Sequence, residues 1–214
     1  MKKVAVYFEG PSDIAAMRQL FGGLIKTKSS AEVSIHFFQA AKGDRKKTLL
    51  MDIPKRAARM LNNGEADIVA IVPDLYPRNK GFDHHTIDEL QNGAYAIFVK
   101  ECARIAPKMQ NTLTQRFKVF CFKHDLEALL LACPDALKYR LNTSKLLVNW
   151  AKSVEDQNHD DPPKEVIKRL FTAHNEKYDE VVDAPLLLEG CDYHTLAKDC
   201  SQGFKPFAEF LENL

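Results

Sequence analysis

The sequence predicts an α/β fold with a mainly parallel, four-stranded sheet and helices on both of its faces. Two observations predict this class. Short β-branched, apolar runs alternate with segments of helical period through the first 140 residues, and glycine or proline bounds several of these runs. Strands that alternate with helices favour parallel pairing, because each return to the sheet passes through a helix.

Four strands and several helices follow from these patterns. The expected strands cover residues 3–8, 33–38, 67–72 and 117–122. Between them, helices are expected from Ser12 or Asp13 to residue 24, from Asp52 and Pro54 to Gly64, and over residues 86–105. A short apolar helix, LEALLLA, follows the fourth strand, and Asp125 is a candidate for its cap.

The last third of the chain has a different character. Its pattern is helical, with helices expected over residues 143–150, 162–171 and 204–214. The first 150 residues carry 23 Lys and Arg against 15 Asp and Glu, whereas residues 151–214 carry 7 against 14. We therefore expect a core domain over residues 1–140 and an acidic helical extension over residues 141–214, packed on that core. The basic part suits a polyanionic partner, and the acidic part suits a protein partner or covers the basic face.

Several classes of protein are disfavoured. No apolar run approaches the roughly 20 residues that span a bilayer, and the first apolar run is too short for a signal peptide, so we expect a cytoplasmic protein without a membrane segment. The five cysteines include no C-x-x-C pair, which favours buried free thiols over a zinc site or a disulfide scaffold. The phosphate-binding, dinucleotide-binding and serine-hydrolase motifs are absent.

Carboxylates follow three of the expected strands. Glu9 comes directly after the first strand, Asp74 after the third, and the pair Asp125 and Glu127 after the fourth. In open parallel sheets, ligands collect beyond the carboxyl ends of the strands. Oxygen ligands from two or three carboxylates suit Mg²⁺, which can hold and activate a phosphodiester. The sequence therefore predicts a divalent-cation site at this edge of the sheet.

A basic cluster lies between the first and third strands. Its members Lys42, Arg45, Lys46 and Lys47 are candidates for binding nucleic-acid phosphates, and a solvated basic face is the alternative. His124 could act as an acid or base, although a histidine at a helix entry is more often satisfied by its neighbours.

Three short motifs together resemble the Toprim domain, the metal-binding fold shared by topoisomerases, primases and the OLD-type nucleases. The sequence E-G-P-S-D at residues 9–13 is similar to the E-G-x-[ST]-[DE] motif of the OLD-type branch. Asp74 in V-P-D-L-Y-P stands where that family has D-x-D, and H-D-L-E at residues 124–127 is similar to its later D-L-E. The closing segment, CSQGFKPFAEFLENL, looks like the tail of small stand-alone bacterial Toprim-like proteins.

This resemblance implies a metal-dependent nuclease that hydrolyses phosphodiester bonds in DNA or RNA. Glu9, Asp74 and Glu127 would be catalytic and would hold Mg²⁺ or Mn²⁺, with Asp13 and Asp125 as further ligands. Asp13 also suits a helix cap. Tyr76 replaces the second acid of D-x-D, and a phenol is a poor magnesium ligand at neutral pH. Either one metal suffices, or Asp13 or Asp125 fills the gap, or catalysis is lost.

The resemblance also implies partners. OLD-type Toprim domains are commonly fused to an ATPase or encoded beside one in systems that resist phage, so we expect an ABC- or SMC-type ATPase as a partner beside nucleic acid. Self-association into a homo-oligomer is compatible with the sequence. Two alternatives stay open: a catalytically silent Toprim-like binding or regulatory subunit, and a small phosphohydrolase acting on nucleotides.

Overall fold

A computed structural model describes residues 1–151 and 153–214. The chain divides into two compact units. Unit 1 comprises residues 1–14, 23–121 and Leu214, and unit 2 comprises residues 15–22 and 122–213. Unit 2 thus contains nearly all of the expected acidic extension. The domain boundary expected at residue 140 stays a prediction.

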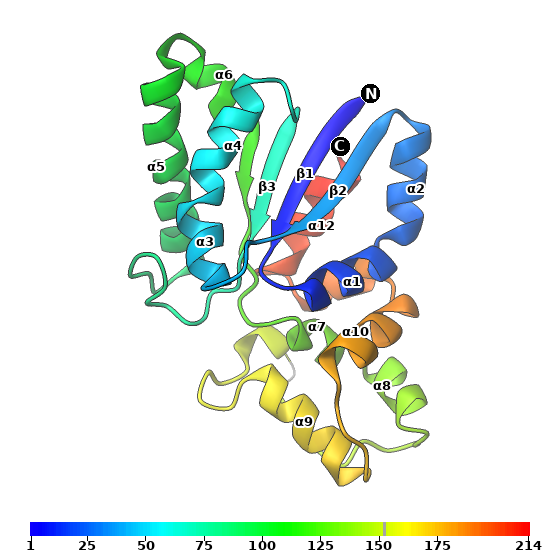
Figure 1. Ribbon diagram of the computed structural model, residues 1–214. Helices are drawn as coiled ribbons and strands as arrows, with labels where there is room; N and C mark the ends of the chain where they lie inside the picture. The colour runs from blue at the N-terminus through cyan, green and yellow to red at the C-terminus, as the bar shows by residue number, and fades with distance from the viewer. Residues whose placement is uncertain (152) are drawn as a thin grey trace. The chain divides into compact units, whose positions relative to one another are not determined.

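Unit 1 contains the predicted sheet. Its four strands are all parallel and lie in the order β2-β1-β3-β4, which confirms the predicted fold class (Figure 1). Val4 of β1 pairs with Ile35 on one side and with Ile68 on the other. The strands are β1 (Lys2–Phe8), β2 (Val33–Gln39), β3 (Ile68–Val72) and β4 (Phe117–Val119). The fourth strand is shorter than expected.

Helices lie on both faces of this sheet. In Figure 1, α4 and α5 lie on one side of the strands and α2 on the other. The first of these faces is covered by a core that includes Leu61, Leu90 and Phe98. As expected, Asp52 precedes α4 and a long helix, α5, follows Thr86. The Thr86 side chain caps α5 by accepting a hydrogen bond from the backbone of Glu89 at 3.1 Å. The elements are α2 (Gly22–Ser30), α3 (Arg45–Met51), α4 (Ile53–Asn62), α5 (Ile87–Ile105), η1 (Pro107–Met109) and α6 (Gln110–Thr114).

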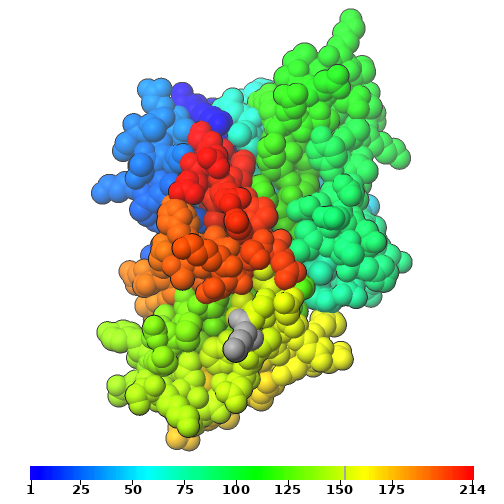
Figure 2. All heavy atoms as spheres, turned by 180° about the vertical axis from the view of Figure 1, so that it is seen from behind, coloured from blue at the N-terminus to red at the C-terminus, as the bar shows by residue number. Residues whose placement is uncertain are grey.

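Unit 2 is helical. Helix α1 begins in unit 1 and ends in unit 2, where Phe21 packs against the rings of Phe204 and Phe207 of α12. Figure 2 shows α11 and α12 adjoining at the surface, in orange and red. The elements are α1 (Pro11–Leu20), α7 (Glu127–Leu131), α8 (Pro134–Arg140), η2 (Val154–Asp156), α9 (Pro163–Ala173), α10 (Glu180–Glu189), α11 (Tyr193–Asp199) and α12 (Phe204–Glu212).

The structure departs from the expected helices at residues 143–150 and in the basic cluster. Residues 143–150 form no helix, because the Thr143 hydroxyl binds the backbone N–H and C=O of Lys145 and Asn142 has a left-handed φ of 47°. Helix α3 was not expected within the basic cluster. The Asp44 side chain starts it by accepting a hydrogen bond from the Lys47 backbone at 3.1 Å.

The cysteines are mostly as predicted. Cys102, Cys121 and Cys200 are buried free thiols. Cys133 and Cys191 form a disulfide, which corrects the expectation that all five would be free. In the described part of the chain, no helix combines the length and the apolarity that a membrane crossing requires.

Candidate functional site

The first and second motifs meet at the carboxyl edge of the sheet in unit 1. Phe8 of β1 pairs with Val72 of β3, so the residues that follow these strands are neighbours. The Glu9 carboxylate accepts a hydrogen bond from the backbone N–H of Asp74, with 3.1 Å between Oε1 and N. The strand-end pattern therefore placed Glu9 and Asp74 correctly relative to each other.

Asp13 lies in the first turn of α1. Its carboxylate accepts a hydrogen bond from the Gly10 backbone N–H at 2.8 Å, as the acidic residue of a capping box does at the start of a helix. Its negative charge also raises the pKa of Glu9. Asp13 thus caps the start of α1 and lies within electrostatic reach of Glu9. Its two expected roles, as a helix cap and as a further metal ligand, are compatible with this position.

Glu9 has an unusual acidity. Burial raises its pKa from 4.5 to about 7, with smaller contributions in the same direction from Asp13 and Asp44. The hydrogen bond from Asp74 and the charge of Lys46 act in the opposite direction. A carboxylate that is costly to ionise favours the approach of a positive charge. A cation at this edge would provide it.

The basic cluster divides into exposed and buried members. Lys42, Arg45 and Lys47 are exposed, as the nucleic-acid hypothesis requires. Lys46 is only 3% exposed, and its ammonium donates hydrogen bonds to the carbonyl oxygens of Leu75 at 2.8 Å and Pro77 at 2.7 Å. This corrects the expectation that Lys46 is available to a nucleic-acid backbone, because the turn of α3 directs it inward.

An open pocket of about 690 Å³ lies over this edge. The carboxylate of Glu9 lines it together with basic side chains on its rim. Lys80 was missed at the level of sequence because it lies 33 residues after Lys47, and it forms an ion pair with Asp44 at 2.8 Å. The pocket is lined by Glu9, Lys42, Gly43, Asp44, Arg45, Lys46, Pro77 and Lys80.

Tyr76 occupies the position of the expected second acid. Its hydroxyl accepts a hydrogen bond from Arg78 at 2.6 Å, and the same guanidinium lies 4.7 Å from the centre of its ring. The phenol is thus engaged by an arginine, which agrees with its unsuitability as a metal ligand.

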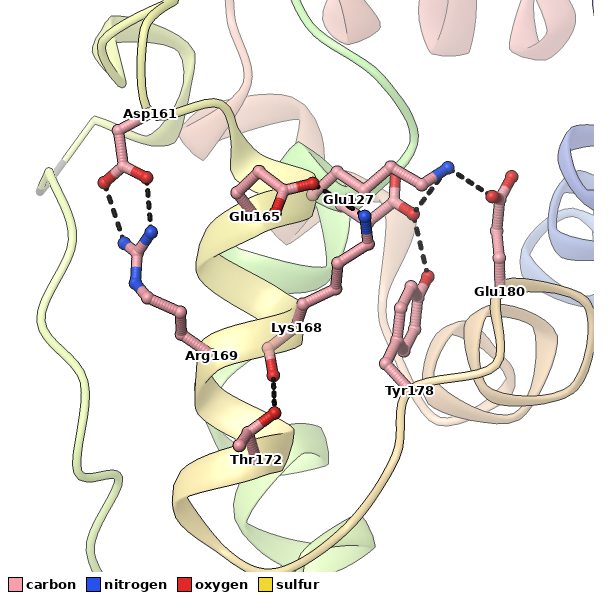
Figure 3. A network of polar contacts seen from close by, with 9 residues as sticks. Glu127, Asp161, Glu165, Lys168, Arg169, Thr172, Tyr178 and Glu180 are labelled. Carbon is pink, nitrogen blue, oxygen red and sulfur yellow. Dashed lines mark hydrogen bonds and ion pairs between the residues drawn. The ribbon is translucent and has the colours of Figure 1, made fainter.

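The third motif lies in unit 2, in a cluster that Figure 3 shows. The Glu127 side chain is 1% exposed, accepts a hydrogen bond from the Tyr178 hydroxyl at 3.1 Å, and lies 3.5 Å from the ammonium of Lys164. Lys164 also pairs with Glu180. The chain itself therefore supplies a counter-charge for Glu127.

Asp125 adds a second buried acid to this cluster. Burial, followed by repulsion from Glu127, raises its pKa to about 8, while Lys164 opposes the shift. One oxygen of each carboxylate, Oδ1 of Asp125 and Oε2 of Glu127, is buried without a hydrogen-bond partner. The two acids belong to a different unit from Glu9 and Asp74, so their convergence into one site stays a prediction.

His124 lies in unit 2 as well and is 4% exposed. Burial lowers its pKa, and the charge of Lys123 adds to this effect. Backbone hydrogen bonds involving Glu155 and Gln157 act in the other direction. His124 is thus a core histidine whose burial disfavours its charged form, and its role as an acid or base stays a prediction.

No ready-made metal cage is present among the residues that the structure describes: no three His, Cys, Asp or Glu side chains gather closely enough to hold an ion. Magnesium, however, usually keeps several waters and is bound through one or two carboxylates plus the phosphates of its substrate. Glu9 and Asp74 offer the hard oxygen donors that such an incomplete site needs. Such donors would suit a cation that keeps part of its water shell.

Comparisons with known proteins place the chain in a family. The model of a family described as a domain of unknown function, DUF4276, matches residues 8–212. Among solved structures, the C-terminal region of the OLD protein of Xanthomonas campestris pv. campestris is similar at a TM-score of 0.43 and 10% sequence identity, over 99% of this chain and 97% of that one. No curated protein matches the sequence. The Toprim resemblance stays a prediction from the three motifs, whereas the family match covers most of the sequence, and the chain belongs to the DUF4276 family.

Proposed function

We propose that this protein is a divalent-cation-dependent nuclease that hydrolyses phosphodiester bonds in DNA or RNA. One observation carries the proposal. The Glu9 carboxylate is hydrogen-bonded to the backbone of Asp74 in an open pocket, and Lys42, Arg45 and Lys80 line the rim of that pocket. Acidic oxygens beside a basic rim suit a substrate that brings both phosphate oxygens and a cation.

The donor chemistry supports Mg²⁺ or Mn²⁺ as the cofactor. Glu9 and Asp74 would hold the ion, with Asp13 nearby as a further acid. When bound, such an ion polarises a phosphodiester and makes water a stronger nucleophile. The residues of the chain orient the ion and bind the backbone of the substrate.

The exposed bases would bind the phosphates. Lys42, Arg45 and Lys80 line the same pocket as Glu9, and Lys47 lies in the first turn of α3 beside Arg45. Contacts of this kind position a strand without reading its sequence. The proposal therefore predicts cleavage with weak sequence preference and strong dependence on salt.

The proposal includes two further elements: the acids of the third motif and an ATPase partner. Glu127 would join the site, with its neighbour Asp125, only if it exchanged its ion pair with Lys164 for a metal, so the proposal depends primarily on Glu9 and Asp74. As the motif resemblance implies, an ABC- or SMC-type ATPase would regulate the nuclease, in anti-phage defence or nucleic-acid processing in the cytoplasm.

A cleavage assay tests the proposal. End-labelled single- and double-stranded DNA and RNA are incubated with Mg²⁺, Mn²⁺ or EDTA. Glu9→Gln and Asp74→Asn are each expected to lower the rate at least about 100-fold, because each removes a charged ligand of the cation. Asp83→Asn, an exposed acid further along the same loop, is the matched control and should keep full activity. Cleavage that persists in the Glu9→Gln/Asp74→Asn double variant excludes this mechanism.

A second candidate is a catalytically silent binding subunit. It is favoured by Tyr76, which stands in the place of an acid and is held by Arg78, and by the lack of a three-ligand cage in the described chain. This alternative predicts salt-dependent binding of nucleic acid without cleavage, alone or with the ATPase. Calorimetric Mn²⁺ binding that is lost in Glu9→Gln would argue against it.

A further inference from the structure

Lys46 differs from every other member of the basic cluster. Its neighbours Arg45 and Lys47 are exposed, whereas its own side chain is buried. Burying an ammonium is costly unless it is hydrogen-bonded and its charge is offset. The hydrogen-bond partners and the neighbouring charges of Lys46 should therefore indicate the role of its buried charge.

The hydrogen bonds of Lys46 go to the loop that carries Asp74. The ammonium donates to the carbonyl oxygens of Leu75 and Pro77, at 2.8 and 2.7 Å. The carbonyl oxygen of Leu75 also lies 3.1 Å from Nε2 of His84, a residue only 1% exposed. Two buried side chains thus converge on the backbone immediately after Asp74 and fix its course.

The charge of Lys46 acts on the acids of the site. Burial lowers the pKa of Lys46, and attraction from Glu9 and then Asp74 opposes that shift. Reciprocally, the charge of Lys46 makes ionisation of Glu9 easier. Lys46 is thus within electrostatic reach of both acids at the carboxyl edge of the sheet, while its hydrogen bonds are to the loop.

We propose that Lys46 is a positioning residue, a resident cation that fastens the loop after β3 and offsets the charge of Glu9 and Asp74. This inference rests on the proposed function for its biological meaning, since the acids it holds are those of the candidate nuclease site. It assigns Lys46 a role other than contact with nucleic acid. The exposed bases keep that task.

A double-mutant cycle between Lys46 and Glu9 tests the charge directly. Urea unfolding is measured at pH 8 in EDTA, without nucleic acid, for the wild type, Lys46→Met, Glu9→Gln and the double variant. Lys46→Met should lower the folding equilibrium constant about tenfold or more in the wild-type background and only about threefold in the Glu9→Gln background, a coupling expected for neighbouring charges. Glutamine at position 9 can still accept the Asp74 hydrogen bond, so the cycle reports on charge.

Two further variants separate charge from structure. Lys47→Met removes the same charge from the exposed neighbouring position and should change the folding constant less than about twofold in either background. Lys46→Gln keeps a hydrogen-bond donor for the loop and replaces Lys46→Met if the latter does not fold. It should cost less than methionine and show the same coupling to Glu9.

The outcomes distinguish this inference from the proposed function. If Lys46→Met or Lys46→Gln changed the folding equilibrium constant equally in the two backgrounds, the proposed role of Lys46 as a cation that offsets Glu9 would be wrong, even if the protein cleaves nucleic acid. Coupling between Lys46 and Glu9 in a protein that cleaves no nucleic acid would support the positioning role of Lys46 and contradict the proposed nuclease function. The cycle contains neither metal nor substrate, so the two failures cannot be confused.

Discussion

The two units each place a lysine beside carboxylates that are partly or fully buried, and they use that lysine differently. In unit 2 the ammonium of Lys164 pairs directly with the carboxylates of Glu127 and Glu180. In unit 1 the ammonium of Lys46 donates hydrogen bonds to backbone carbonyls, and its charge acts on Glu9 and Asp74. The first arrangement neutralises its acids by direct contact, and the second leaves Glu9 facing an open pocket.

This difference shows what a buried acid signifies. Glu127 lies in a nearly apolar helix, which from sequence alone suggests a ligand, yet a lysine 37 residues later provides its counter-charge. A buried acid that forms an ion pair with a lysine of the same chain has a structural role, because breaking a buried ion pair is costly. An acid that lines a pocket with exposed bases is the stronger functional candidate.

The largest expected effect lies in unit 2. Lys164→Met would leave Glu127 and Glu180 without their shared counter-charge, and it should lower the free energy of unfolding by about 3 kcal/mol at pH 7. Urea unfolding measures this change.

Helix α9 offers a matched control for that experiment. Lys168 pairs with Glu165 at the surface, one turn from Lys164 (Figure 3). Lys168→Met should cost less than about 0.5 kcal/mol, as exposed pairs contribute little. Similar costs for the two variants would mean that the cluster around Glu127 is not a buried network, and the contrast between the units would weaken.

The next effect tests whether packing holds the loop of unit 1. A Cβ added at Gly93 in α5 would lie 2.3 Å from the ring of Phe82, two residues before His84. Gly93→Ala should therefore cost about 2 kcal/mol and loosen the loop that carries Asp74. Gly23→Ala in α2 meets nothing within 4 Å and should be neutral or stabilise by up to about 1 kcal/mol. Hydrogen exchange of the amides of residues 73–84 reports the loosening; unchanged exchange would argue against it.

The pH dependence of stability sharpens the contrast at Glu9. Its pKa is raised from 4.5 to about 7, so the folded state keeps a proton that the unfolded state has released. The free energy of unfolding should therefore fall as pH rises from about 4.5 to about 7, by on the order of 1–2 kcal/mol from this group. Glu9→Gln lacks this component.

Subtraction isolates the contribution of Glu9. Asp125, with its pKa raised to about 8, adds a decline of the same sign to both proteins. The difference between wild type and Glu9→Gln, measured in EDTA, should therefore change only below about pH 7. A flat difference would show that Glu9 is solvated in the folded protein.

The smallest effect concerns the basic rim. Lys42→Ala should leave stability unchanged and weaken nucleic-acid binding, and it should reduce the slope of log K against log salt by about 1. Fluorescence anisotropy at several salt concentrations measures that slope. A slope equal to that of the wild type would remove Lys42 from the proposed interface.

Much of the fold could be predicted from local patterns, because each strand and long helix has its own period. The four strands, the start of α5 at Thr86, and α9 after Pro162 follow from residues that are near one another in sequence. The proximity of Glu9 and Asp74 also follows, since parallel strands end at one edge of the sheet.

The remaining features depend on partners distant in sequence. The counter-charge of Glu127 comes from α9, and the acceptors of Lys46 come from a loop 29 residues later. The pairing of Cys133 with Cys191 spans 58 residues. No local pattern specifies such contacts, and in the case of Lys46 an unexpected helix turned the side chain inward.

The position of β1 inside the sheet has a consequence for synthesis. β1 emerges from the ribosome before its neighbour β3, which is complete only when residue 72 has been made. Until then the apolar run VAVYF has an unpaired edge, and such edges are vulnerable to aggregation. We expect nascent chains stalled before residue 72 to bind chaperones, and longer ones to escape them.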